Sequence, residues 1–180
     1  MADTNAVIAV YDNHSAAEDA VKELQKSGFD MKKLSIVGKD YHTDEQVVGY
    51  YNAGDRMKYW GKWGAFWGGF WGLLFGAAFF WVPAIGPVLV GGPLVVSIVA
   101  GLEDAVVVGG LSAIGAGLFS LGIPKNSVVT YETAIKAGEY LVVAHGTSAE
   151  ADKARNILST LKPTQIANHL LQPAAQAAAR

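Results

Sequence analysis

Two parts of the chain show the same order of apolar and polar positions. Residues 6–11, AVIAVY, are a short apolar run closed by turn-forming residues, which predicts a strand. Apolar residues then recur every three or four positions from Ala17 to Leu24, which predicts a helix that ends at Gly28. The run LSIVG at residues 34–38 predicts a second strand.

The same pattern returns near the end of the chain. Residues 140–144 predict a strand, and apolar positions from Ala151 to Leu161 predict a helix that Pro163 stops. A further short strand is expected at residues 164–170. Two strand-helix-strand units are what a split-βαβ, ferredoxin-like sandwich requires. We therefore expect an α+β fold in which the two halves share one sheet.

Local sequence also predicts where helices begin and end. Ser15 and Glu18 have the spacing of a capping box, as do Thr147 and Glu150. Another helix is expected from about Asn126 until a closing glycine at position 138.

The region between the two halves has a different character. No Asp, Glu, Lys or Arg occurs between Trp63 and Leu102. Glycine recurs at every fourth position, one residue after an aromatic series. Each glycine costs a helix roughly 1 kcal/mol relative to alanine, and close contact between two helix backbones restores that stability. The expected helix-packing residues are Gly64, Gly68, Gly72, Gly76, Trp63, Trp67 and Trp71.

A second stripe of small residues follows, in an expected helix from about residue 94 to residue 121. Its members include Gly101, Gly109 and Ser112. Residues 83–93 contain three prolines and should interrupt helical structure. The region is therefore expected to be a Gly-zipper helical hairpin, which serves for helix packing and oligomerisation.

The length of the first expected helix is that of a membrane span. Residues 63–82 are twenty residues, enough at about 1.5 Å per residue to cross about 30 Å of hydrocarbon. Basic residues before and after the hairpin predict that both of its ends stay in the cytoplasm. Pairing of the two halves in one sheet also requires that the hairpin crosses the membrane an even number of times or not at all.

An acidic pair opposes this membrane interpretation. Glu103 and Asp104 interrupt the second expected helix, and a central acidic residue costs roughly 2.5 to 3.5 kcal/mol on insertion. They are a candidate intramembrane proton or cation site, or they cap a helix break or face the mouth of an oligomer. Trp67 and Trp71 would also lie deeper than tryptophan prefers. Packing of the hairpins against one another, with or without lipid, is therefore an open alternative.

Composition excludes several kinds of chemistry. The chain has 180 residues, a formal charge of −2 and no cysteine, so thiolate sites and disulfides are excluded and no nucleic-acid partner is expected. No two of the four histidines have the spacing of metal ligands on a helix, and no phosphate-binding GxxxxGK[ST] occurs. The start of the chain lacks the pattern of a secretory signal. We expect no catalytic, cofactor-binding or metal-binding residue.

Three stretches carry a resemblance to a known family. They are FFWVPAIGPVLVGGPL from Phe79, with its IGP and GGP at residues 85–93, LGIP at residues 121–124, and the run that follows it, KNSVVTYETAIKAGEYLVVAHG. Over residues 6–161 the chain resembles bacterial general stress protein 17M-like and heat-induced stress proteins. The resemblance implies a stress-linked, glycine-rich, membrane-associated protein of no established chemistry.

These observations divide the chain into four parts. Residues 1–58 and 124–171 are the expected halves of the ferredoxin-like domain, residues 59–123 the apolar hairpin, and residues 172–180 a loose tail. The leading hypothesis is a non-enzymatic stress protein of the cell membrane, with cytoplasmic termini, whose partners are lipid and copies of itself. The alternatives are a cytoplasmic, soluble or lipid-containing assembly such as a ring, shell or filament, and a small-molecule sensor.

Overall fold

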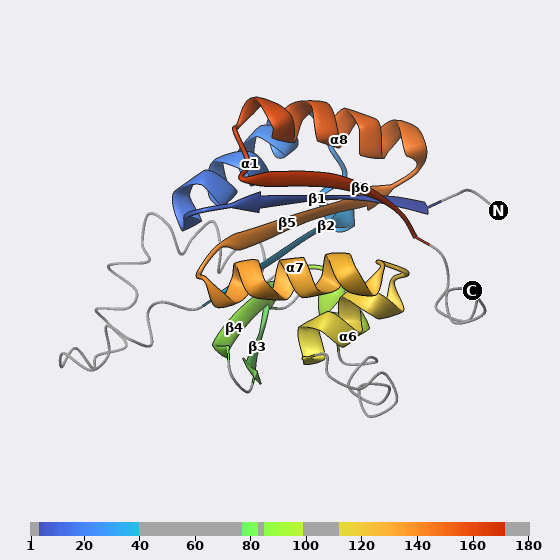
Figure 1. Cartoon of the computed structure of the whole chain (residues 1–180). Helices are drawn as coiled ribbons and strands as arrows, with labels where there is room; N and C mark the ends of the chain where they lie inside the picture. The colour runs from blue at the N-terminus through green and yellow to red at the C-terminus, as the bar shows by residue number, and fades with distance from the viewer. Residues whose placement is uncertain (1–3, 40–76, 83–84, 99–111, 172–180) are drawn as a thin grey trace.

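The computed structural model describes residues 4–39, 77–82, 85–98 and 112–171, and Figure 1 shows their arrangement. Six strands form one sheet in the order β3-β4-β2-β5-β1-β6, with every neighbouring pair antiparallel. The elements in chain order are β1 (Thr4–Tyr11), α1 (His14–Lys26), the 3₁₀ helix η1 (Met31–Lys33), β2 (Leu34–Lys39), β3 (Ala77–Val82), β4 (Gly86–Gly91), α6 (Ala113–Ser120), α7 (Lys125–Lys136), β5 (Tyr140–Gly146), α8 (Ser148–Thr160) and β6 (Gln165–Leu171).

The two halves of the chain share this sheet, as their sequence pattern predicts. β5 from the second half lies between β1 and β2 from the first, with Val143 opposite Ile8 and Val142 opposite Ile36. β6 pairs with the other edge of β1 along its whole length. The expected strands, the helix before β5 and the helix before β6 are all confirmed.

Helices cover both faces of the sheet (Figure 1). Along β1, Ile8 faces the core beneath α6 and α7, while the next residue, Ala9, faces the core beneath α1 and α8. In the sequence, a strand that is buried on both faces is a continuous apolar run, without the alternation of apolar and polar residues that a half-exposed strand shows. This is why residues 6–11 contain no polar position before the hydroxyl of Tyr11.

One of the two predicted capping boxes forms. The Thr147 side chain accepts the N–H of Glu150, whose carboxylate accepts the N–H of Thr147 in return. The capping box predicted at residues 15–18 is wrong. Helix α1 begins two residues earlier than a Ser15 cap would place it, at His14, because the side chain of Asn13 accepts the N–H of Ala16 at 2.8 Å. Asparagine is among the best N-cap residues.

The expected helix over residues 63–82 is wrong at its end, because residues 77–82 form β3. The proline-containing stretch after it is expected only to separate two helices. In the structure its residues 86–91 form the strand β4. β4 pairs with both β2 and β3, and Val88 lies between Lys39 and Phe80. β2 offers an open sheet edge, and aromatic and β-branched residues suit a strand that extends it.

The second expected helix is not continuous. Residues 94–98 are helical, as predicted from Leu94 on, but Ser112 has extended backbone and is the N-cap of a separate helix, α6. No helix in the part of the chain that the structure describes is long and apolar enough to cross a membrane. The remaining predicted packing and acidic residues lie outside the described residues. They are Gly64, Gly68, Gly72, Gly76, Trp63, Trp67, Trp71, Gly101, Gly109, Glu103 and Asp104.

Candidate functional site

The described parts of the apolar region rest on a small set of residues in the α/β unit. We call this set the base, and it consists of Ser35, Gly38, Gly117, Glu132 and Tyr140. Ser35 holds the turn between β4 and residues 94–98, and each of the others holds the chain near a point where residues 40–76 or 99–111 begin or end.

Ser35 fixes the turn that follows β4. Gly92 has φ +90, and a Cβ placed there would lie 2.9 Å from the Cα of Ser35, so the two backbones are in close contact. The buried hydroxyl of Ser35 accepts the N–H of Leu94 at 3.1 Å. This hydrogen bond therefore fixes the first residue of the helical segment 94–98 against β2.

Gly117 allows the same short helix to touch α6. A Cβ at Gly117 would lie 2.6 Å from Cγ1 and 2.8 Å from Cα of Ile98, which is fully buried. No side chain fits in that space, so the helix backbones approach closely at this glycine. Gly117 is not a member of the stripe of small residues that the sequence predicts.

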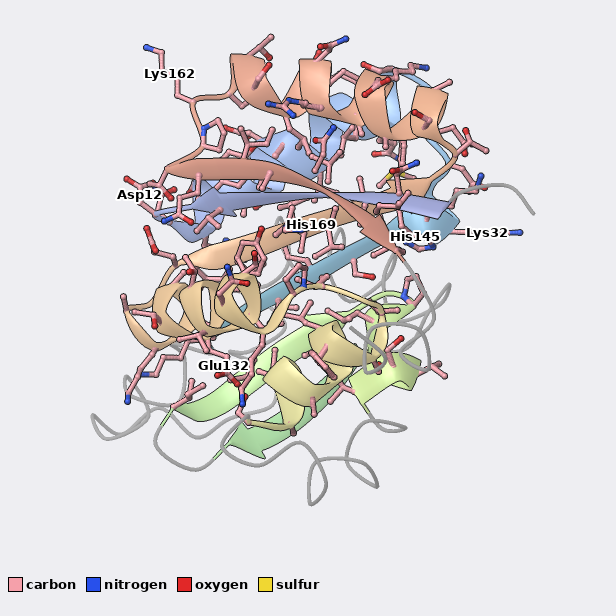
Figure 2. All side chains as sticks on the ribbon, turned by 45° about the vertical axis from the view of Figure 1, so that its right-hand side comes forward. Asp12, Lys32, Glu132, His145, Lys162 and His169 are labelled. Carbon is pink, nitrogen blue, oxygen red and sulfur yellow. The ribbon has the colours of Figure 1, made fainter. Side chains whose placement is uncertain are left out.

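Glu132 on α7 holds the start of α6 (Figure 2). Its carboxylate accepts the backbone N–H of Ser112 at 2.8 Å and the Ser112 hydroxyl. The Ser112 oxygen also accepts the N–H of Gly115. The sequence predicts Ser112 to be a helix-packing residue, and in the structure it is the point where α6 leaves residues 99–111 and joins the core.

Tyr140 fixes the end of β2. Its hydroxyl donates to the carbonyl oxygen of Lys39 at 3.1 Å, and its ring covers Gly38, where a Cβ would collide with it. The ring of His14 meets that of Tyr140 edge-on at 5.5 Å. The last described residue before residues 40–76 is thus held by β5 and the start of α1.

A separate ionic cluster lies at the opposite end of β5. Lys33 Nζ is 2.7 Å from Glu150 Oε1. The hydrogen bond from Lys33 and that from the backbone N–H of Thr147 lower the pKa of Glu150 to about 2. Burial, with the nearby Lys33 charge, lowers the pKa of His145. Lys33 joins η1 to α8 through Glu150, and Glu150 with Thr147 caps α8.

A polar contact joins α7 to the edge strand β6. The hydroxyl of Tyr131 lies 2.6 Å from Nε2 of His169. Burial raises the pKa of Tyr131 to about 12 and lowers the pKa of His169. Both groups are therefore uncharged near neutral pH, and the contact is a neutral hydrogen bond.

Helix α1 contains a buried carboxylate. The Glu18 side chain is 2% exposed and its Oε1 lies 2.7 Å from Lys22 Nζ. Its Oε2 has no hydrogen-bond partner among the described residues, and Nδ1 of His14 is 3.9 Å away from it. This carboxylate is therefore buried beside a lysine of the same helix.

These clusters hold elements together. Among the described residues, no three or more His, Asp or Glu side chains lie close enough to hold a metal ion. Sequence reasoning missed Glu132, Tyr140 and Gly92, because each acts on a residue that is distant along the chain. The positive φ of Gly92 has one local signal, the Gly-Gly-Pro sequence that ends β4.

The chain was compared with curated proteins, solved structures and protein families. No curated protein and no solved structure is similar to this chain at a significant level. Residues 6–79 match the family model described as the heat induced stress protein YflT domain. This range begins inside β1, covers α1 and β2, and ends inside β3. The resemblance to heat-induced stress proteins is therefore confirmed for residues 6–79, which are similar to the heat induced stress protein YflT domain.

Proposed function

We propose that this protein is a non-enzymatic stress-response protein that forms homo-oligomers through its glycine-rich apolar region. The match of residues 6–79 to the heat-induced stress protein domain supports the stress-response role. One structural observation carries the oligomer proposal. The described parts of the apolar region, β3, β4 and residues 94–98, are built into the sheet and core of the α/β unit.

The α/β unit is proposed to be ferredoxin-like. The strand order β2-β5-β1-β6, with α1 and α8 on one face, supports this assignment, because it places two βαβ units in one antiparallel sheet. The β3–β4 hairpin then extends the β2 edge, and α6 and α7 cover the second face.

The base gives the apolar region a rigid support. Tyr140 holds the start of residues 40–76, and Gly117 and Glu132 hold the two ends of residues 99–111. Fixed end points restrict where a partner can meet this region, which favours specific self-association over non-specific adhesion.

Chain length favours contact between sister copies over a membrane-crossing hairpin. With residues 77–82 in β3, the uncharged stretch before them is fourteen residues, 63–76. As a helix these residues would extend about 21 Å, less than the hydrocarbon thickness of about 30 Å. Residues 94–98 also belong to the core and not to such a hairpin, since Ile98 packs there against Gly117.

Membrane association is the second candidate function. The basic residues Arg56, Lys58 and Lys62 directly precede the first tryptophans of the uncharged stretch. Cationic side chains attract anionic lipid, and tryptophan favours the membrane–water interface. In this version the protein lies on the cytoplasmic face of the membrane and inserts its apolar region from that side.

The size of the purified protein tests the proposal. We expect particles of defined size, larger than a monomer, in light scattering without detergent. Flotation with vesicles of anionic lipid separates the two versions, because only the membrane version moves with the vesicles. A chain that remains monomeric without detergent and does not float contradicts both.

A double substitution tests the role of glycine. Gly68→Leu with Gly72→Leu should reduce oligomer size, because larger side chains separate closely packed helices. Val129→Leu with Thr130→Leu is the matched control, since both residues are exposed on α7 and outside the apolar region. Unchanged assembly in the glycine variant would show that this region does not form the contact.

A further inference from the structure

The edge strand β6 has an open side. It is the last strand of the sheet, its seven residues pair with β1, and no described strand pairs with its outer edge. Leu170 is 49% exposed although it belongs to a strand. Figure 1 shows β6 running along the margin of the sheet next to α8.

This edge lacks the features by which proteins block unwanted strand pairing. Such edges usually carry lysine, proline, a bulge or an inward-pointing charge. The β6 sequence QIANHLL has no charged residue, proline or glycine. Its one ionisable side chain, His169, is held uncharged near neutral pH, because burial lowers its pKa.

We propose that β6 pairs with β6 of a second copy of this chain, in an antiparallel two-fold dimer that continues the sheet across both molecules. An uncharged strand is compatible in charge with a copy of itself, whereas a charged strand would place like charges opposite each other. The apolar region takes no part in this contact.

Symmetry determines the register of the pairing. Two identical antiparallel edge strands in one sheet are related by a two-fold axis perpendicular to the sheet. The side chains of directly opposed residues therefore point to the same side of the sheet. Only one register pairs all seven residues, and it places Asn168 opposite Asn168 of the second copy. Leu170 then lies opposite Ile166, twice in each dimer.

The side chains suit this register. Ile166 packs at the margin of the core beneath α1 and α8, and Asn168 and Leu170 share its side of the sheet by strand alternation. The dimer therefore has an amide pair at its centre, flanked by two leucine–isoleucine pairs. Cross-strand apolar pairs of this kind are among the contacts that stabilise sheets. On the other side, His169 remains hydrogen-bonded to Tyr131.

Two other occupants of the edge would give different results. One is the tail of the same chain, residues 172–180, which follows β6 directly. The other is an extended peptide from a different protein. Symmetric pairing at Asn168 is expected from neither of them.

A disulfide between identical positions tests the register, because the chain contains no cysteine of its own. Directly opposed residues of antiparallel strands have Cα atoms about 4.5 to 5.5 Å apart, within the range of disulfides. Asn168→Cys should form a covalent dimer under mild oxidation. Leu170→Cys is the matched control, because the two copies of residue 170 would lie about 13 Å apart, at about 3.3 Å per residue.

The cross-linking has clear outcomes. Rapid dimer formation by Asn168→Cys, with little by Leu170→Cys or by Val129→Cys at a similarly exposed site on α7, supports the proposal. Equal cross-linking of all three variants, or none by Asn168→Cys, overturns it. A chain that cross-links only after removal of residues 172–180 shows that the tail occupies the edge, which also overturns it.

A charge exchange gives a second test that needs no oxidation. Asn168→Lys and Asn168→Asp should each weaken the dimer, since each places two like charges opposite one another. Mixing the two variants should restore it, and native mass spectrometry would detect the mixed dimer. If the mixture dimerises no better than either variant alone, Asn168 does not face itself and the proposal is wrong. Glycine-dependent assembly is measured separately by the Gly68 and Gly72 substitutions, so each proposal can fail alone.

Discussion

Glu132 on α7 and Ser112 at the start of α6 form a two-point contact, in which one carboxylate accepts both the backbone N–H and the hydroxyl of the serine. This contact links two helices that are twenty positions apart at these residues. It also fixes the place where residues 99–111 enter the core.

Removal of this carboxylate should destabilise the fold. We expect Glu132→Ala to lower the free energy of unfolding by about 1.5 to 3 kcal/mol, because hydrogen bonds to a charged group are lost and the Ser112 N–H loses its partner. Glu132→Gln should cost less, since its amide oxygen still accepts that N–H. Urea unfolding measures both, with the exposed neighbour Thr133→Ala as control. Equal effects of Glu132→Ala and Thr133→Ala would contradict this role.

Two lysines of α1 provide a matched comparison. Lys22 pairs with Glu18, whose side chain is 2% exposed, whereas Lys26 pairs with Glu23, which is 45% exposed. We expect Lys22→Ala to cost about 1 to 2 kcal/mol, because it leaves a buried carboxylate without its cation. Lys26→Ala should cost less than about 0.5 kcal/mol, as is usual for surface pairs. Thermal and urea unfolding would measure both, and similar losses would show that the Glu18 charge is not desolvated as its burial implies.

Acid should weaken the cap of α8. The pKa of Glu150 in the folded chain is about 2, below its ordinary value of 4.5, chiefly because Lys33 and the Thr147 N–H bind its charged form. The stabilisation is therefore complete above pH 4.5 and is lost as the pH falls from 4.5 towards 2. Unfolding measured across this range should show a shallower acid dependence in Glu150→Gln. Glu23→Gln is the control for loss of a surface carboxylate, and an equal change in both variants would contradict the prediction.

Gly117→Ala should destabilise the chain although alanine favours helices. The new methyl group would meet the Ile98 backbone, because the Cα of Ile98 lies only 2.8 Å from the position that the alanine Cβ would take, and so would displace residues 94–98. We expect a loss of about 1 to 3 kcal/mol, in the range of overpacked cores. Ile98→Ala should not rescue the variant, because it removes the side chain and leaves the Cα in place. Urea unfolding measures both variants, and a gain in stability from Gly117→Ala would show that the helices separate easily.

The sequence predicted the elements whose signals are local. Asp12 and Asn13 end the first strand, Thr147 and Glu150 begin α8, and the positive φ of Gly138 closes α7, all within a few residues of the features they determine. Burial on both faces also made the central strands recognisable as continuous apolar runs.

The β3–β4 hairpin could not be predicted in the same way. Residues 77–91 are apolar at nearly every position, so neither a helical nor a strand period distinguishes them. What selects the strands is the open edge of β2, where Lys39 pairs with the distant Val88 of β4, and β4 in turn pairs with β3. Within the candidate site, the Ser112–Glu132 contact is hidden for the same reason, since it joins two separate helices.

β2 and β3 run in the same direction, with β4 between them. Residues 40–76 therefore connect the last residue of β2 with the first residue of β3, which lie at opposite ends of these strands. In general, the entropic cost of closing a loop grows only with the logarithm of its length, by about 0.6 kcal/mol for each doubling. Evolution can therefore lengthen or shorten this connection at small thermodynamic cost while the sheet stays intact. The fold is suited to carrying appended segments of very different size on one unchanged scaffold.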